Sequence, residues 1–147
     1  MDRQNWEEYF MNIAFQVATR STCDRNHVGA VLVRDRMILS TGYNGSIRGL
    51  DHCDDVGHLI ENGSCIRTVH AEANAIAQAA RNGINCSDSE LYVTTAPCWN
   101  CFKLVANAGI KKIYFTRHYK DKRTLEFAKL AGIEMIQLNI EKMEVIE

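Results

Sequence analysis

Residues 90–116 read ELYVTTAPCWNCFKLVANAGIKKIYFT, and the fold class can be predicted from this stretch. A short apolar run lies near each end, which predicts strands over residues 90–95 and 111–116. Between the two strands we expect a helix over residues 98–108. Two strands joined by a crossover helix pair in parallel, so this part of the chain is predicted to be a βαβ unit.

The alternation of helices and strands extends outward from this unit. The pattern predicts a helix at about 3–20, two hairpin strands at 28–33 and 37–42, helices at 70–82 and 121–131, and a strand at 133–138. We therefore expect one α/β domain over residues 1–147, with a mixed five-stranded sheet and helices on both faces.

Composition restricts the classes of function. The 147 residues carry a formal net charge of -1, which disfavours a grip on long nucleic acid and favours a small ligand. No apolar run approaches the roughly 20 residues that span a bilayer, and the polar N-terminus lacks a signal-peptide core. We expect a cytoplasmic protein without membrane contact, in which six cysteines indicate metal ligation and not disulfides.

Two motifs suggest a catalytic zinc site. His70 and Glu72 open one predicted helix, and Cys98 and Cys101 open another, just after Pro97. Zinc in a catalytic site takes three protein ligands and leaves one position open, and one imidazole with two thiolates supplies the three. Cys98 and Cys101 are three positions apart, so a helix places both sulfurs on one face. The predicted zinc ligands are His70, Cys98 and Cys101.

Glu72 is the predicted catalytic acid and base. Zinc lowers the pKa of bound water to about 7, and a neighbouring carboxylate can move the released proton to a ring nitrogen and a leaving amine. The combination of H-x-E with P-C-x-x-C is the known signature of zinc-dependent nucleobase deaminases. A purely structural zinc site would need a fourth ligand, for which Cys86 is the obvious spare, but a free thiol is the favoured interpretation of Cys86.

Stretches within the zinc motif and beyond it carry a family resemblance. They are Arg20-Ser21-Thr22-Cys23, His27-Val28-Gly29-Ala30, Gly42-Tyr43-Asn44-Gly45, the stretch from Thr68 to Ile76, and the stretch from Pro97 to Ile110. On these residues the chain resembles the deoxycytidylate (dCMP) deaminases of the cytidine deaminase-like superfamily, over about residues 5–138. The resemblance implies a three-layer α/β/α fold and hydrolysis of dCMP to dUMP and ammonia, in the supply of the dTMP precursor. It also implies a homo-hexamer activated by dCTP and inhibited by dTTP.

Two other classes of function stay open at this point. One is a deaminase of bases in RNA or DNA, such as a tRNA adenosine deaminase, which shares the zinc motif but lacks the cysteine-rich insertion before His70. The other is a non-catalytic, zinc-stabilised nucleotide-binding module. Glu72 argues against the latter, because a structural site has no use for an unliganded carboxylate beside its metal.

The insertion over residues 43–69 shows no sustained period, and a loop of this length is usually functional or held by something. It contains several metal-capable side chains, and the resemblance favours a second, structural zinc in this region. The preferred closed Cys₃His set is Cys23, Cys53, His58 and Cys65. His52 is the alternative ligand, and free thiols in a loop ordered by nucleotide are the alternative to a second metal.

The remaining candidates concern nucleotide binding. By resemblance, Asn44 contacts the ribose and the backbone at Ala71 and Ala96 reads the base; the alternative for Asn44 is a turn residue beside Gly45. Arg25 and Asn26, and then Arg48, are candidates for the 5′-phosphate, and Tyr119 for the phosphate or the base. An effector triphosphate, accompanied by Mg²⁺, is expected near a subunit interface at Gly45, Ser46, Arg48, Gly49 and Asp51.

Overall fold

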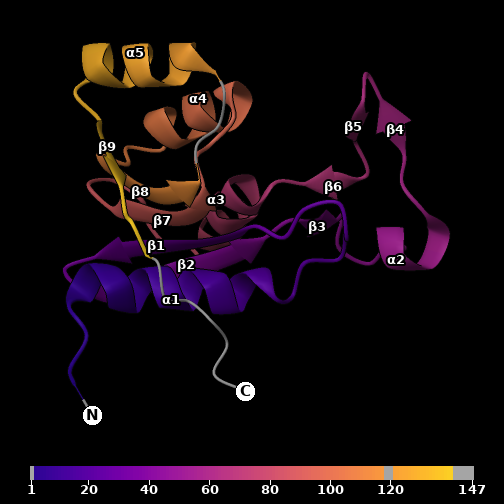
Figure 1. Cartoon of the computed structure of the whole chain (residues 1–147), viewed down its shortest axis with the longest axis horizontal. Helices are drawn as coiled ribbons and strands as arrows, with labels where there is room; N and C mark the ends of the chain where they lie inside the picture. The colour runs from indigo at the N-terminus through magenta and orange to yellow at the C-terminus, as the bar shows by residue number, and fades with distance from the viewer. Residues whose placement is uncertain (1, 118–120, 141–147) are drawn as a thin grey trace.

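The structure is a computed structural model that describes residues 2–117 and 121–140 (Figure 1). The strands of its main sheet lie in the order β2 (Met37–Tyr43), β1 (Gly29–Arg34), β7 (Glu90–Thr95), β8 (Lys112–Arg117) and β9 (Glu134–Gln137). β1 pairs antiparallel with β2 and β7, whereas β7, β8 and β9 are parallel. The predicted mixed five-stranded sheet is therefore confirmed.

The hairpin of β1 and β2 closes at Asp35 and Arg36. Both residues have left-handed backbone angles, with φ of 52° and 62°. Two successive left-handed residues are typical of a type I′ turn, whose twist matches that of the flanking strands. The polar turn expected from the sequence thus joins two strands of the sheet directly.

Helix α1 (Trp6–Ala18) covers one face of the sheet (Figure 1). It begins where the Asn5 side chain accepts a hydrogen bond from the Glu8 N–H, at 2.9 Å. Buried residues of α1, among them Phe10 and Met11, pack with Val31 and with the aromatic rings of β7 and β8. This packing makes α1 one complete layer of the fold.

The other face is covered by α3 (Ala71–Arg81), α4 (Trp99–Asn107) and α5 (Lys122–Ala131) (Figure 1). The buried side chains of this layer include Ala75, Phe102 and Ala128, which pack on Leu91 and Ile113 of the sheet. Helices on both faces give the three-layer α/β/α arrangement that the resemblance implied. The predicted positions of the three helices agree with the structure to within a few residues.

Helix α3 lies unusually close to β2, because Gly42 has no side chain. A Cβ atom at Gly42 would overlap the carbonyl oxygen of Ala71 and the backbone nitrogen of Ala75. The close approach lets the Ser40 hydroxyl donate to the Ala75 carbonyl at 2.8 Å and the Asn74 amide donate to the Tyr43 carbonyl at 2.8 Å. These contacts determine where the N-terminus of α3 lies relative to the sheet.

The insertion contains more regular structure than the sequence predicts. Its elements are β3 (Gly45–Ser46), α2 (Cys53–Val56), β4 (Ile60–Glu61), β5 (Ser64–Cys65) and β6 (Thr68–Val69). The expectation of a loop without structure is wrong here, because strands of two residues are too short to show an alternating pattern. The pairs β3–β6 and β4–β5 form two small ribbons.

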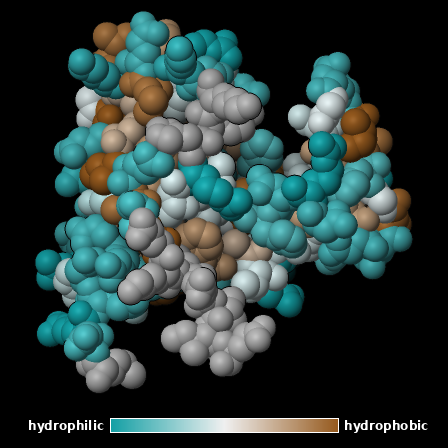
Figure 2. Space-filling model, viewed as in Figure 1, coloured by the Kyte–Doolittle hydropathy of each residue, from teal (hydrophilic) through white to brown (hydrophobic). Residues whose placement is uncertain are grey.

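The insertion extends away from the sheet as an arm (Figure 1). Its outer surface carries apolar side chains, visible at the right of Figure 2, which include Leu59, Ile60 and Ile66. Within residues 2–117 and 121–140, no helix has the length and apolar character needed to cross a membrane.

Candidate active site

The three predicted catalytic ligands meet where two helices begin. His70 follows β6 and is the N-cap residue of α3, and Cys98 is the N-cap residue of α4. The Nδ1 atom of His70 lies 3.5 Å from Cys98 Sγ and 3.3 Å from Cys101 Sγ. The structure thus brings together residues that lie 28 and 31 positions apart in the chain.

The donor atoms suit a zinc ion. Zn–S bonds of about 2.3 Å and Zn–N bonds of about 2.0–2.1 Å imply S···N separations of about 3.6 Å in a tetrahedral site. The measured separations of 3.5 and 3.3 Å are close to this value. One imidazole and two thiolates leave the fourth tetrahedral position for water or substrate, which is typical of catalytic and not of structural zinc sites.

The protonation of the two cysteines differs. A hydrogen bond from the Cys101 thiol, assisted by His70, lowers the pKa of Cys98 to about 4. The same hydrogen bond, together with burial, raises the pKa of Cys101. Cys98 is therefore a thiolate at neutral pH, and Cys101 loses its proton when a metal ion binds.

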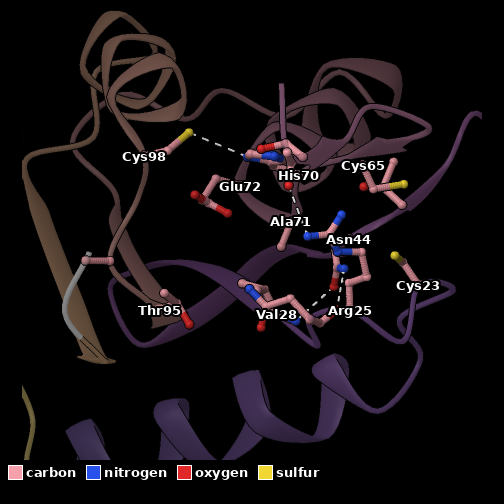
Figure 3. Close-up of a pocket in the computed structure, with 15 residues that line it drawn as sticks. Cys23, Arg25, Val28, Asn44, Cys65, His70, Ala71, Glu72, Thr95 and Cys98 are labelled. Atoms are coloured by element: carbon pink, nitrogen blue, oxygen red, sulfur yellow. Dashed lines mark hydrogen bonds between the residues drawn. The ribbon is translucent and has the colours of Figure 1, made fainter. Parts of the chain in front are cut away.

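Glu72 lies beside the three ligands and is buried, with an exposed fraction of 4%. Burial raises the pKa of its carboxyl group to about 7, against the opposing effects of its own backbone N–H and of His70. A carboxyl group with this pKa can both accept and donate a proton near neutral pH. Figure 3 shows Glu72 and Cys98 together on one side of the cavity described next.

A cavity of about 330 Å³ opens in front of these residues (Figure 3). This volume lies within the range of small-ligand sites, about 300–1,000 Å³. The cavity lies at the carboxyl end of β7, where open α/β sheets commonly bind ligands. The predicted nucleotide-binding residues that line it are Arg25, Asn26, Asn44, Ala71 and Ala96.

Asn44 is held in place by two hydrogen bonds. Its Oδ1 atom accepts from the Val28 N–H at 2.8 Å, and its Nδ2 atom donates to the Asn26 carbonyl at 2.7 Å. The second N–H of the amide is left for a ligand. Asn44 is not among the described residues with a positive φ, so a left-handed turn does not account for its presence.

The backbone groups of Ala71 and Ala96 offer different contacts. Ala71 is the first residue of α3, where a backbone N–H has no acceptor within the helix. The N–H of Ala96 already donates to the Arg117 carbonyl at 2.8 Å. The cavity can therefore use a donor at Ala71, whereas at Ala96 only the carbonyl oxygen is available.

The second predicted metal set also converges. Ligand atoms of Cys23, Cys53, His58 and Cys65 all lie within 4.8 Å of one another. Cys23 Sγ is 3.4 Å from His58 Nδ1, and Cys53 Sγ is 3.6 Å from Cys65 Sγ. A tetrahedral Cys₃His zinc site would have S···N and S···S separations of about 3.6 and 3.8 Å, so these donors also suit zinc.

The thiols of this second cluster also differ in their protonation. Burial, together with the hydrogen bonds of the neighbouring thiols, raises the pKa of Cys53 to about 12. Burial also acts to raise the pKa of Cys65, but the hydrogen bonds of the Arg67 and Leu59 backbone, together with those of Cys53 and His58, lower that pKa to about 6.

Two alternative ligands lie elsewhere. His52 is the N-cap residue of α2, with Nδ1 3.9 Å from the Asp55 carboxylate, and it is not part of the cluster. Cys86 packs against the main hydrophobic core and belongs to neither group of metal-capable residues among those the structure describes.

The candidate effector residues lie on or near the arm and do not line the cavity. Gly45 and Ser46 form β3, whereas Arg48, Gly49 and Asp51 are exposed. Arg48, the third phosphate candidate, is therefore not among the residues that line the cavity. Tyr119 lies outside the described residues.

Some lining residues were missed from the sequence. They are Val28, Gly63, Ser64, Thr68 and Thr95. Small and hydroxyl side chains of this kind carry no distinctive pattern, so only the folded arrangement identifies them. Arg25 connects its own segment to the arm, because its guanidinium donates to the Gly63 carbonyl at 3.0 Å.

Comparison with protein families supplies the context for this geometry. The sequence model of the cytidine and deoxycytidylate deaminase zinc-binding region matches residues 4–117. The chain belongs to this family of deaminases. The match includes both helix N-termini that carry the predicted zinc ligands.

Individual relatives agree with this assignment. The chain is 42% identical over 146 residues to ComE operon protein 2 of Bacillus subtilis, covering 99% of this chain and 77% of that protein. It is 36% identical over 129 residues to the deoxycytidylate deaminase of Mycobacterium phage D29, and this alignment covers 80% of this chain and 98% of the phage protein. It spans less than half of the deoxycytidylate deaminases of two yeasts, 44% and 46% of their lengths.

A solved structure is similar over nearly the whole chain. The dCMP deaminase of cyanophage S-TIM5, in complex with dCMP and dUMP, superposes with a TM-score of 0.81 at 30% identity. The alignment covers 94% of this chain and 100% of that one. This similarity confirms the cytidine deaminase-like fold.

Proposed function

We propose that this deaminase hydrolyses dCMP to dUMP and ammonia. The observation that carries the proposal is the grouping of His70, Cys98 and Cys101 around buried Glu72 in a cavity of nucleotide size. The curated deoxycytidylate deaminases and the dCMP-bound phage structure support the choice of substrate. The near-neutral net charge of -1 also favours a small nucleotide over a nucleic acid.

His70, Cys98 and Cys101 would hold the metal. Zinc, when bound there, supplies Lewis-acid chemistry that makes water a nucleophile at neutral pH. The N-terminus of α4 favours the thiolate form of Cys98. Gly42 and Ser40 hold α3 against the sheet and so determine the position of His70 and Glu72.

Glu72 is proposed to move the protons. It accepts a proton from the attacking water and donates one to N3 of the pyrimidine. The water oxygen forms a bond to C4, and the C4–N4 bond then breaks. A second proton from the hydroxyl group, carried by Glu72, leaves with the amine as ammonia.

The rest of the cavity is proposed to bind the nucleotide. Asn44 contacts the sugar through its remaining amide N–H, and the backbone groups at Ala71 and Ala96 contact the base. Arg25 and Asn26 also line the cavity, and a 5′-phosphate is proposed to pair with the Arg25 guanidinium. We also propose Tyr119 for the phosphate or the base, from its place in the sequence after the strand at 111–116.

A second, structural zinc at Cys23, Cys53, His58 and Cys65 is proposed from the short distances among the four donor atoms. Both metal sites require reduced thiols, and the six cysteines are all free of disulfides. This requirement supports the proposal that the protein works in a reducing compartment such as the cytoplasm.

Regulation and assembly are proposals that rest on resemblance alone. Activation by dCTP and inhibition by dTTP would use Gly45, Ser46, Arg48, Gly49 and Asp51, with Mg²⁺ accompanying the triphosphate, in a homo-hexamer. A sigmoidal rate curve that dCTP makes hyperbolic, in a particle of six chains by light scattering, supports this assignment. A hyperbolic curve that neither nucleotide changes would remove it.

The substrate is tested by following ammonia release from cytidine, dCMP, dCTP and adenosine-containing RNA. We expect dCMP to be the preferred substrate. Release confined to the RNA would replace the proposed activity with that of an RNA-base deaminase.

A further inference from the structure

One carboxylate lies directly behind the second metal cluster. The Oδ1 atom of Asp24 is 2.9 Å from Nε2 of His58, on the opposite side of the ring from the nitrogen that faces the thiols. The other ring nitrogen, Nδ1, is 3.4 Å from Cys23 Sγ. Asp24 therefore contacts the histidine without lying among the four donor atoms.

This contact selects the tautomer of His58. A carboxylate oxygen at this distance accepts a hydrogen bond from the ring, which places an N–H on Nε2. Nδ1 then carries a lone pair directed toward the cluster, as metal binding requires. Histidine ligands in metal sites commonly donate their second N–H to a carboxylate, which also fixes the orientation of the ring.

We propose that Asp24 is a positioning residue of the second metal site, and that it acts by orienting His58 for a zinc ion. The inference rests on the proposed second zinc. Asp24 does not contribute to the hydrophobic core, because 75% of its side chain is exposed. Its hydrogen bond to His58 is the contact that the structure gives this side chain, so its removal costs little packing.

The arrangement has a consequence for the substrate cavity. Cys23 and Cys65 both line that cavity, on the side opposite Glu72 and Cys98 (Figure 3). The cluster thus joins the segment that carries Arg25 to the arm. When His58 is no longer oriented, this wall of the cavity is held by fewer contacts, and nucleotide binding weakens more than the chemical step.

The test compares Asp24→Ala with two other variants of the full-length protein. Asp24→Glu keeps the carboxylate, and Asp55→Ala is a matched control. Asp55 is also an exposed acidic residue beside a histidine, at 3.9 Å from His52, but it lies outside the cluster. Zinc per chain is measured by mass spectrometry, and the affinity of each site by competition with a chromophoric chelator.

We expect two zinc ions per chain in the wild-type protein. In Asp24→Ala the affinity of one site should fall by about 10- to 100-fold, the usual effect of losing such a carboxylate. The tighter catalytic site should be unchanged, Asp24→Glu should recover part of the loss, and Asp55→Ala should match the wild type. When Asp24→Ala carries zinc at the catalytic site alone, KM for dCMP should rise while kcat changes little.

Cobalt substitution adds a spectroscopic readout that a loss of folding would not reproduce. Absorption of a Co²⁺–thiolate site should be weaker for Asp24→Ala at limiting cobalt and equal to the wild type at saturation. Affinity within twofold of the wild type in Asp24→Ala would overturn the role of Asp24 while leaving the second zinc in place. A single zinc per chain in the wild type would instead overturn the second site and the role of Asp24 together.

Discussion

Adding one methyl group at Gly42 should disturb the active site by displacing α3, whose backbone packs directly on Gly42. The new Cβ atom would lie 2.9 Å from the Cα atom of Ala75 and would overlap the carbonyl oxygen of Ala71. Ordinary carbon–carbon contacts are about 3.5–4.0 Å, so α3 must move by roughly 0.6–1 Å. These neighbours are backbone atoms, which cannot rotate away as a side chain can.

We expect Gly42→Ala to lower both the stability of the protein and its catalytic rate. Overpacking of this kind destabilises proteins by about 1–3 kcal/mol. A displacement of about 1 Å in catalytic groups can lower the rate by about 100-fold. Because α3 begins at Ala71 and carries Glu72, Gly42→Ala should lose activity even where the protein remains folded.

Urea unfolding gives the change in stability, and steady-state deamination of dCMP gives the change in kcat. Gly45→Ala is a suitable control for the unfolding measurement alone, because its new Cβ would first meet side-chain atoms of Thr22 and Tyr43, at 3.2 and 3.3 Å. Alanine also lowers the conformational entropy of the unfolded chain, which should stabilise the folded protein by about 0.4–1 kcal/mol and offset that crowding. Wild-type stability and kcat in Gly42→Ala would refute the close-packing argument.

Three further changes have defined outcomes. Glu72→Gln keeps the shape of the side chain but cannot move protons, so kcat should fall by about 10²–10⁴-fold with zinc and nucleotide binding retained; loss of zinc would contradict this role. Asn44→Ala leaves the Val28 N–H and the Asn26 carbonyl without their partner. The free energy of unfolding should fall by about 1–3 kcal/mol, and dCMP binding should weaken. An unchanged free energy of unfolding would argue against this structural role of Asn44. Asp121 caps α5 and its pKa is lowered by its hydrogen bonds with Arg123, so it stabilises the fold above the pKa of the unfolded chain. The stability difference between wild type and Asp121→Ala should therefore vanish as pH falls through the lowered pKa, in urea titrations from pH 7 to 2; a pH-independent difference would exclude this charge effect.

The catalytic cluster was predictable because its parts are local. Cys98 and Cys101 lie one helical turn apart, and His70 and Glu72 stand at the start of another helix. The second cluster was harder to predict from the sequence, because His52, next to Cys53, and His58, between Cys53 and Cys65, were both candidate ligands. Only the folded arm directs His58 toward Cys23 and places His52 at the start of α2.

Other features became visible only in three dimensions. The Asn44 amide already makes two hydrogen bonds with backbone groups, which leaves one of its two N–H groups for a ligand. Arg48, Gly49 and Asp51 share a stretch of sequence with Asn44 but lie away from the cavity. The contact of Asp24 with His58 joins residues 34 positions apart and leaves no pattern in the chain.

The order and type of the main helices and strands, the mixed sheet, and the residue types of both Cys/His clusters could be predicted from the sequence alone. These follow from periodicities and short spacings that backbone geometry imposes locally. The tertiary structure decided which distant segments meet: the Cys23 segment with the arm, α3 with Gly42, and both helix N-termini with one cavity. Such contacts depend on how the layers pack, and packing depends on all the elements at once.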